Sequence, residues 1–141
     1  MAIEQFALLH PLRVRWSEAD MQGVVFNAHY LAYFDVAITE YWRALAGGDA
    51  SWLADALEHL FVVKATVEFH RPARFDDELT VGARCVRLGR SSMTIDFEIH
   101  RGGDRLISGQ SIYVHAREAK SLPIPDDLRG RIEAFEKIAP L

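Results

Sequence analysis

The stretch from Trp16 to Trp42, WSEADMQGVVFNAHYLAYFDVAITEYW, decides the fold of this chain. It contains the start of a segment, Tyr30 to Leu45, that has no Pro or Gly and only three charged residues. A helix over this segment would be about 25 Å long at a rise of about 1.5 Å per residue. A helix that is apolar on most sides is typical of a buried element. Gly47 and Gly48 follow it, as glycines commonly follow the C-terminus of a helix.

Asp20 precedes this helix, on a turn that contains Gly23. Upstream, Leu12, Val14 and Trp16 alternate with polar residues, and this period of two predicts a half-buried strand. Gly23 permits a tight turn or a close backbone approach. We therefore interpret Asp20 as an ionisable group held at the mouth of an apolar site. Its position alone leaves a second interpretation open, in which Asp20 only caps the helix or stabilises the turn.

Beyond the two glycines, a short helix is predicted at about 51–57, and the pattern then changes to a period of two. The run Arg101-Gly102-Gly103-Asp104 is a hairpin signal, and an amphipathic helix follows Pro125. Consecutive strands favour an antiparallel sheet, and a single long apolar helix beside them favours a sheet that wraps around it. The predicted strands after the short helix cover residues 63–70, 79–89, 93–100 and 106–116.

The composition fits one soluble, packed α+β domain over residues 1–141, since half of the residues are apolar and about a quarter are charged. A net charge of -4 argues against a large nucleic-acid interface. The first residues contain no basic n-region, and no stretch is long and apolar enough to span a bilayer. We therefore expect no signal peptide, no membrane insertion and a cytoplasmic location. The single cysteine, Cys85, lies in an alternating run and is expected in the core.

Two motifs resemble a known family. Asp20, Gly23, Phe26, Asn27 and Tyr30 match the signature of the hotdog-fold acyl-CoA thioesterases of the 4-hydroxybenzoyl-CoA thioesterase type, a group similar to the thioesterases associated with the Tol-Pal system. The later run EFHRPARFDDEL, from residue 68 to residue 79, resembles the junction between the second and third strands of that family. The likeness extends from about residue 11 to about residue 135.

The resemblance implies a single hotdog domain, in which an antiparallel five-stranded sheet wraps around one long buried helix, with an accessory C-terminal helix. It also implies that subunits join their sheets into a homodimer or homotetramer and that the active sites lie between subunits. An exposed sheet edge independently favours such pairing. No cofactor is expected beyond the coenzyme A of the substrate. No metal is expected either, because the six histidines lack ligand spacing.

For the chemistry, the resemblance implies that Asp20 is the general base or the nucleophile of thioester hydrolysis. The backbone N–H of Asn27, at the positive end of the helix dipole, would polarise the thioester carbonyl. The Tol-Pal-associated group usually has a His where this chain has Asn27, and here a His comes two residues later, at His29. His29 either assists Asp20 or only begins the helix and faces solvent. Gly23, Phe26 and Tyr30 are expected to contact substrate.

Basic residues are expected to meet the phosphates of coenzyme A. Arg87, Arg90 and Ser91 lie at a turn between two strands, where the family often places basic residues, and an arginine there would bind phosphate through two hydrogen bonds. A solvated hairpin end is the alternative interpretation. His70 and Arg71 are further candidates to reach a neighbouring subunit.

Two other functions remain open at this stage. A hotdog protein that binds acyl-CoA or an acyl carrier without turnover would most simply have lost the carboxylate, whereas Asp20 is present. A hotdog hydratase or dehydratase pairs its Asp with a His five residues later, where this chain has Val25. The sequence therefore predicts a thioester hydrolase and does not predict its acyl group.

Overall fold

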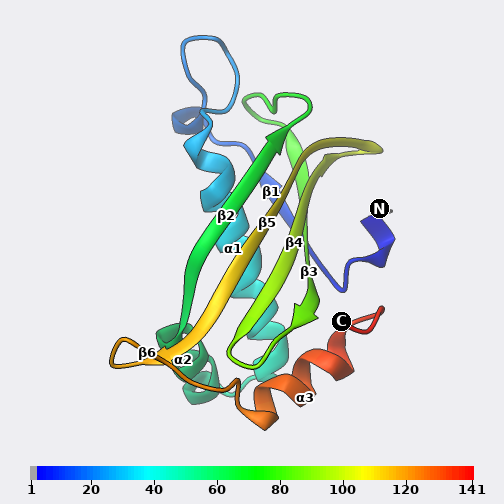
Figure 1. Ribbon diagram of the computed structural model, residues 1–141. Helices are drawn as coiled ribbons and strands as arrows, with labels where there is room; N and C mark the ends of the chain where they lie inside the picture. Colours follow the sequence, from blue (N-terminus) through cyan, green and yellow to red (C-terminus); the bar gives the residue numbers. More distant parts are fainter. Residues whose placement is uncertain (1–2) are drawn as a thin grey trace.

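The computed structural model describes residues 3–141 (Figure 1). Residues 1 and 2, with which the predicted domain begins, lie outside the described residues. Two short 3₁₀ turns, η1 (Ile3–Gln5) and η2 (Trp16–Glu18), flank the first strand. In chain order the other elements are β1 (Leu8–Arg13), α1 (Ala28–Ala46), α2 (Ala50–His59), β2 (Leu60–Phe69), β3 (Glu78–Leu88), β4 (Ser92–Arg101), β5 (Asp104–Arg117), β6 (Lys120–Ser121) and α3 (Asp126–Phe135).

The strands form one antiparallel sheet that curls around α1 (Figure 1). Its strand order is β1-β3-β4-β5-β2, which confirms the predicted five-stranded antiparallel sheet, and the short β6 pairs with β5 outside this path. Two residues are too few to produce a recognisable alternation, so β6 was not predicted. The sheet and α1 share one core. Its strand side chains include Val81, Ala83, Cys85, Met93, Ile95, Phe97, Ile99 and Tyr113.

The predicted long helix is confirmed as α1 and begins two residues earlier than expected. Gly47 ends it in the left-handed conformation, with φ of 58°, as the glycine pair indicated. One face of α1 is buried, and its aromatic residues dominate the core. The other face leaves Leu31 and Val36 exposed by 42% and 37%. Burial on most sides is therefore not reached within a single protomer.

Phe34 sets the distance between α1 and the sheet. Its ring stacks on Phe97, with centroids 4.5 Å apart and planes 9° apart. The same ring lies over Gly109 of β5, where an added Cβ would come within 2.5 Å of it. Only glycine allows this approach, so the helix sits directly on the strand backbone.

The strand before Asp20 differs from the prediction. The alternation of Leu12, Val14 and Trp16 suggested a strand that continues through Trp16, but β1 ends at Arg13 and Trp16 is 77% exposed. The cause is Glu18, which binds the main chain and the guanidinium of Arg15 and thereby turns the chain into η2. Asp20 is therefore delivered by a tight turn and not directly by a strand.

Candidate active site

Asp20 lies in a small hairpin between η2 and α1. Its N–H donates to the carbonyl of Val24 at 2.8 Å, and the N–H of Gly23 donates back to the carbonyl of Asp20 at 3.0 Å. Gly23 has φ of 79°, a conformation that glycine adopts readily. The Oδ1 atom of Asp20 accepts a hydrogen bond from the N–H of Gln22 at 2.8 Å. Asp20 thus stabilises its turn with one oxygen, while Oδ2 has no hydrogen-bond partner within residues 3–141 and is available for chemistry.

The first turn of α1 follows this hairpin. Asn27 is the N-cap residue, but its side chain is exposed and makes no capping hydrogen bond. The N–H of His29 donates to the carbonyl of Phe26, whereas the N–H groups of Asn27 and Ala28 have no acceptor in the described part of the chain. Free N–H groups at the positive end of a helix dipole suit an oxygen that acquires negative charge. The predicted donor at Asn27 therefore has its N–H unoccupied.

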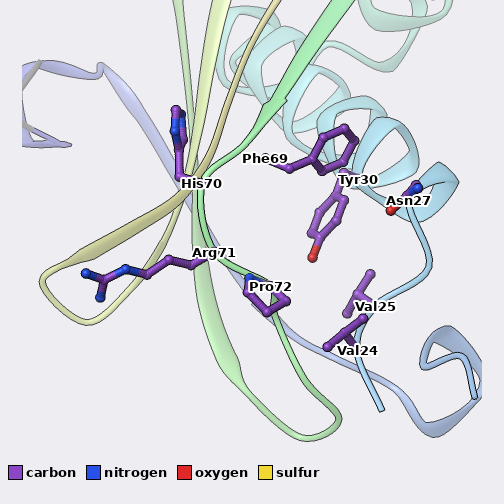
Figure 2. Close-up of a pocket in the computed structure, with 8 residues that line it drawn as sticks. All are labelled: Val24, Val25, Asn27, Tyr30, Phe69, His70, Arg71 and Pro72. Atoms are coloured by element: carbon purple, nitrogen blue, oxygen red, sulfur yellow. The ribbon is translucent and has the colours of Figure 1, made fainter. Parts of the chain in front are cut away.

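A cavity of about 160 Å³ opens between this helix start and the junction of β2 with β3 (Figure 2). The hydroxyl of Tyr30 accepts a hydrogen bond from the N–H of Ala73 at 3.0 Å. Burial raises the pKa of Tyr30; the bond from Ala73 opposes this, and the negative charges of Asp20 and Asp77 add to it. The phenol of Tyr30 therefore stays neutral beside the start of α1. The cavity is lined by Val24, Val25, Asn27, Tyr30, Phe69, His70, Arg71 and Pro72.

Asp20 itself lines a second, open hollow of about 520 Å³, together with Trp16, Met21 and Phe75. Trp16 and Phe75 meet edge to face with centroids 5.1 Å apart. Met21 is fully exposed, and Phe75 is 47% exposed. Exposed apolar side chains gathered around a carboxylate are typical of a surface that a ligand or another subunit covers.

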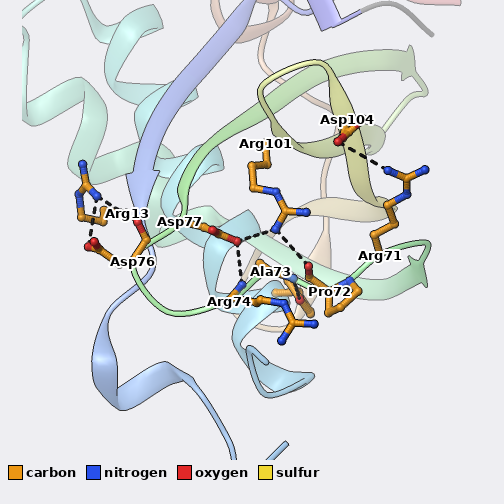
Figure 3. Close-up of polar contacts among 10 residues, drawn as sticks. Arg13, Arg71, Pro72, Ala73, Arg74, Asp76, Asp77, Arg101 and Asp104 are labelled. Carbon is orange, nitrogen blue, oxygen red and sulfur yellow. Dashed lines mark hydrogen bonds and ion pairs between the residues drawn. The ribbon is translucent and has the colours of Figure 1, made fainter. Parts of the chain in front are cut away.

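The residues of the EFHRPARFDDEL motif hold the loop that faces the Asp20 hairpin (Figure 3). Asp77 accepts hydrogen bonds from the guanidinium of Arg101 at 2.7 Å and from the N–H of Arg74 at 2.8 Å. The loop then meets the hairpin through the N–H of Val25, which donates to the carbonyl of Ala73 at 2.8 Å. The two motifs that resemble the thioesterase family are therefore neighbours in space, and the second one supports the first.

His29 and Phe26 pack against each other at the start of α1. The two rings meet edge to face with centroids 6.1 Å apart, His29 is half-buried and Phe26 is 51% exposed. Neither residue lines the cavity near Tyr30 or the hollow around Asp20.

The structure does not bring the predicted phosphate-binding residues to Asp20 within one protomer. Arg87 is the last residue but one of β3, and Arg90 and Ser91 lie in the turn before β4, at the opposite end of the sheet from the Asp20 hairpin (Figure 1). This turn is bound to the C-terminal part of the chain, since the carbonyl of Arg90 accepts the N–H of Ile124. The 19 residues of α1, about 28 Å at 1.5 Å per residue, lie between the two ends.

Two buried polar residues beside the site were missed by the sequence analysis. Glu18 is 4% exposed and accepts a hydrogen bond at 2.8 Å from the hydroxyl of Tyr33 on α1. The only local signal was the spacing of Arg15 and Glu18, which resembles a capping box. The partner on α1 lies fifteen positions away, so no local pattern indicates it.

Cys85 is fully buried, as predicted, and burial with the nearby charge of Glu136 raises its pKa to about 12. Among residues 3–141, no three His, Cys, Asp or Glu side chains lie close enough together to hold a metal ion. The described helices also include none long and apolar enough to cross a membrane.

The chain is similar to known thioesterases both in sequence and in structure. Residues 22–108 match the thioesterase superfamily. The chain is 30% identical over 105 residues to the acyl-CoA thioester hydrolase YbgC of Escherichia coli, covering 74% of this chain and 77% of that protein. It is 22% identical over 123 residues to the 1,4-dihydroxy-2-naphthoyl-CoA hydrolase of Synechococcus elongatus, covering 85% and 90%. A thioesterase from Thermus thermophilus, solved with coenzyme A and zinc, superposes with a TM-score of 0.87 at 31% identity over 98% of this chain and 99% of that one.

Proposed function

The chain belongs to the thioesterase superfamily of hotdog-fold thioester hydrolases, and from this premise we propose that it hydrolyses acyl-CoA thioesters to a free acid and coenzyme A, with Asp20 as the catalytic carboxylate. The main support is the free Oδ2 atom of Asp20, in a hairpin that leads directly into the first turn of α1, where the N–H groups of Asn27 and Ala28 have no acceptor in the described part of the chain. Hydrolysis needs both a carboxylate and an oxyanion donor.

The proposed reaction places the thioester oxygen at the N–H of Asn27. In the general-base route, Asp20 takes a proton from water while the water oxygen attacks the carbonyl carbon. The oxyanion then collapses, the carbon–sulfur bond breaks, and the thiolate takes up a proton. In the nucleophilic route, Asp20 attacks the carbon itself, the carbon–sulfur bond breaks, and the coenzyme A thiolate leaves and takes up a proton. Water then opens the resulting anhydride, which releases the free acid and restores the Asp20 carboxylate. Either route requires the free Oδ2 atom, and both remain part of the proposal.

The surrounding residues have supporting roles in this proposal. Gly23 shapes the turn that presents Asp20, and the neutral phenol of Tyr30 lines the cavity beside the helix start. Phe26 offers an exposed aromatic surface to substrate. The packing of His29 against Phe26 favours the interpretation in which His29 begins the helix over the one in which it assists Asp20.

We propose that the active unit is a homodimer or homotetramer that uses β2. This strand is an edge of the sheet, and nearly all of its residues are exposed in one protomer, including Phe61, Val62, Val63 and Phe69. A long apolar edge strand is a template for pairing with another chain. Because Arg87, Arg90 and Ser91 lie far from Asp20 in one protomer, their proposed phosphate contacts require a site that another subunit completes.

The alternative function is a hotdog protein that binds acyl-CoA without turnover. The discriminating experiment incubates the protein with short aliphatic, long aliphatic and aromatic acyl-CoAs and follows thiol release. We expect turnover with at least one class. Tight binding of every class without thiol release would contradict the hydrolase proposal and favour the binding protein, and a hydrated acyl-CoA product would favour a hydratase.

A further inference from the structure

Glu18 is buried two residues before Asp20, and its carboxylate has four donors. The N–H of Arg15 donates to Oε1 at 2.8 Å, and the guanidinium of Arg15 donates to Oε2 at 2.6 and 3.1 Å. The hydroxyl of Tyr33 donates to Oε1 at 2.8 Å. The described donors of this carboxylate therefore come from Arg15, the residue before η2, and from α1, so Glu18 joins the two elements that flank the Asp20 hairpin.

The backbone connects this contact directly to the catalytic turn. The carbonyl of Glu18 accepts the N–H of Phe26 at 2.9 Å, and Ala19 pairs with Val25 in a β-bridge. Asp20 and Val24 form the next hydrogen bond of the same small ladder. Glu18 and Phe26 thus form the base of the hairpin, and Asp20 lies near its tip. A shift at the base would move the tip relative to the N–H of Asn27.

Glu18 stays ionised and hydrogen-bonded, which fits a structural role and not a direct role in the reaction. Burial alone would raise the pKa of Glu18, but the hydrogen bonds from Arg15 and Tyr33 outweigh it and leave the pKa below its usual value. Burial and the nearby carboxylate raise the pKa of Tyr33, so its hydroxyl stays protonated and keeps donating. A carboxylate with four donors, in a residue 4% exposed, has no atom left for substrate.

We infer that Glu18 and Tyr33 are positioning residues that lock the Asp20 hairpin onto the first turns of α1. The inference deepens the proposed function and rests on it. A well-placed carboxylate and oxyanion donor together account for much of the rate of such reactions, and a displacement of about 1 Å can lower the rate by about 100-fold. Loss of the contact should therefore lower kcat while leaving KM, which reflects substrate binding elsewhere, nearly unchanged.

Tyr41 supplies a matched control on the same helix. Its hydroxyl donates to Glu136 at 2.6 Å, so Tyr41, like Tyr33, is a buried tyrosine of α1 that donates to a buried carboxylate. It lies two turns further along α1 and away from Asp20. Tyr33→Phe and Tyr41→Phe therefore remove the same kind of hydrogen bond from the same helix, and only the first removes it at the Asp20 hairpin.

The test measures kcat, KM, melting temperature and hydrogen exchange of residues 18–27 in the wild type, Tyr33→Phe, Tyr41→Phe and Glu18→Gln. We expect Tyr33→Phe to lower kcat by about 10-fold or more with KM within about 2-fold, and to speed exchange in residues 18–27. Glu18→Gln keeps an oxygen that can accept from Tyr33 but presents an NH2 donor to the guanidinium of Arg15, so it should also lower kcat and speed exchange in residues 18–27. Tyr41→Phe should keep the wild-type kcat and exchange in these residues even if its melting temperature falls.

Equal effects of Tyr33→Phe and Tyr41→Phe on kcat and on exchange would overturn the inference. Failure of the proposed function has a different signature, because the wild type itself would then release no thiol from acyl-CoA. The exchange measurement needs no substrate, so it tests the contact between Glu18 and Tyr33 whether or not the protein hydrolyses acyl-CoA.

Discussion

At the scale of single residues, Asp20 combines a turn contact with a free carboxylate oxygen, so the turn role is observed and the catalytic role stays a proposal. Its Oδ1 atom stabilises the turn, and its Oδ2 atom is unoccupied within the described residues. The spacing of Asp20, Gly23 and Asn27 was enough to predict a turn followed by a helix start, because both depend on local conformation. The contact between Glu18 and Tyr33 was not predictable, because it depends on how η2 packs against α1.

The proposed oxyanion donor can be tested by removing one N–H group. Asn27 has φ of -48°, close to the value that proline fixes, and proline is tolerated where a helix begins. We expect Asn27→Pro to lower kcat by about 100-fold or more, the usual effect of losing an oxyanion donor. Asn27→Ala keeps the backbone N–H and removes only a side chain that makes no capping hydrogen bond. Because the proposed oxyanion donor is retained, its kcat should stay within about 3-fold of wild type. Equal kcat values for the two variants would contradict the donor role.

At the scale of elements, periodicity predicted α1, β3, β4 and β5 because each has side chains in a common core. The alternation of β2 was also predicted, although nearly all of its residues are exposed in one protomer. Periodicity failed at β1, where the alternation continues past Arg13 although Glu18 has already turned the chain. Periodicity also failed to show that one face of α1 is exposed in one protomer. An apolar residue such as Leu31 fits the pattern equally well whether its side chain packs in its own core or against another subunit.

The contact between α1 and β5 gives a stability prediction. Gly109→Ala should destabilise the fold by about 1–3 kcal/mol, because the new methyl group would force Phe34 off Phe97. Gly130→Ala is the control, since Gly130 lies inside α3 with no atom within 4 Å of an added Cβ, and it should stabilise by about 0.5–1 kcal/mol. Urea unfolding measures both. If Gly109→Ala left the free energy of unfolding unchanged, α1 would be less closely packed on β5 than the structure shows.

At the scale of the whole molecule, the C-terminal segment is tied to the core through Glu136. Its Oε2 atom accepts hydrogen bonds from the hydroxyl of Tyr41 at 2.6 Å and the N–H of Cys85 at 2.7 Å, while Oε1 is buried without a partner in the described structure. Burial raises the pKa of Glu136 despite the two hydrogen bonds. Proximity in sequence could not reveal this link, because it joins α1, β3 and the chain end.

The raised pKa of Glu136 predicts the sign of a pH effect. A carboxyl group with a higher pKa when folded contributes its full stability below the unfolded pKa of about 4.3, and that contribution is lost as pH rises through the folded pKa. Glu136→Gln cannot titrate. The stability of Glu136→Gln relative to wild type, measured as the difference in free energy of unfolding, should therefore be larger at pH 7 than at pH 4. Urea unfolding at the two pH values checks this, and an unchanged difference would contradict the raised pKa.

Assembly through β2 can be tested in solution. Light scattering at micromolar concentration should show a dimer or tetramer for the wild type. Val63→Lys puts a charge on the exposed edge strand β2, and Leu9→Lys puts one on the other edge strand, β1, as a control. We expect Val63→Lys to shift the protein toward the monomer and Leu9→Lys to leave the mass unchanged. A monomeric wild type would count against the proposed assembly.

The catalytic role of Asp20 is tested by the turnover of Asp20→Asn on the best acyl-CoA of the wild type, followed by thiol release. Asparagine keeps an oxygen that can accept the N–H of Gln22, so the turn should persist and the melting temperature should change little. We predict that kcat falls by about 100-fold or more, because the variant has neither a base nor a nucleophile at this position. A folded Asp20→Asn protein that releases thiol within about 2-fold of the wild-type rate would contradict the catalytic role of Asp20, since general acid–base catalysis typically contributes at least about 100-fold.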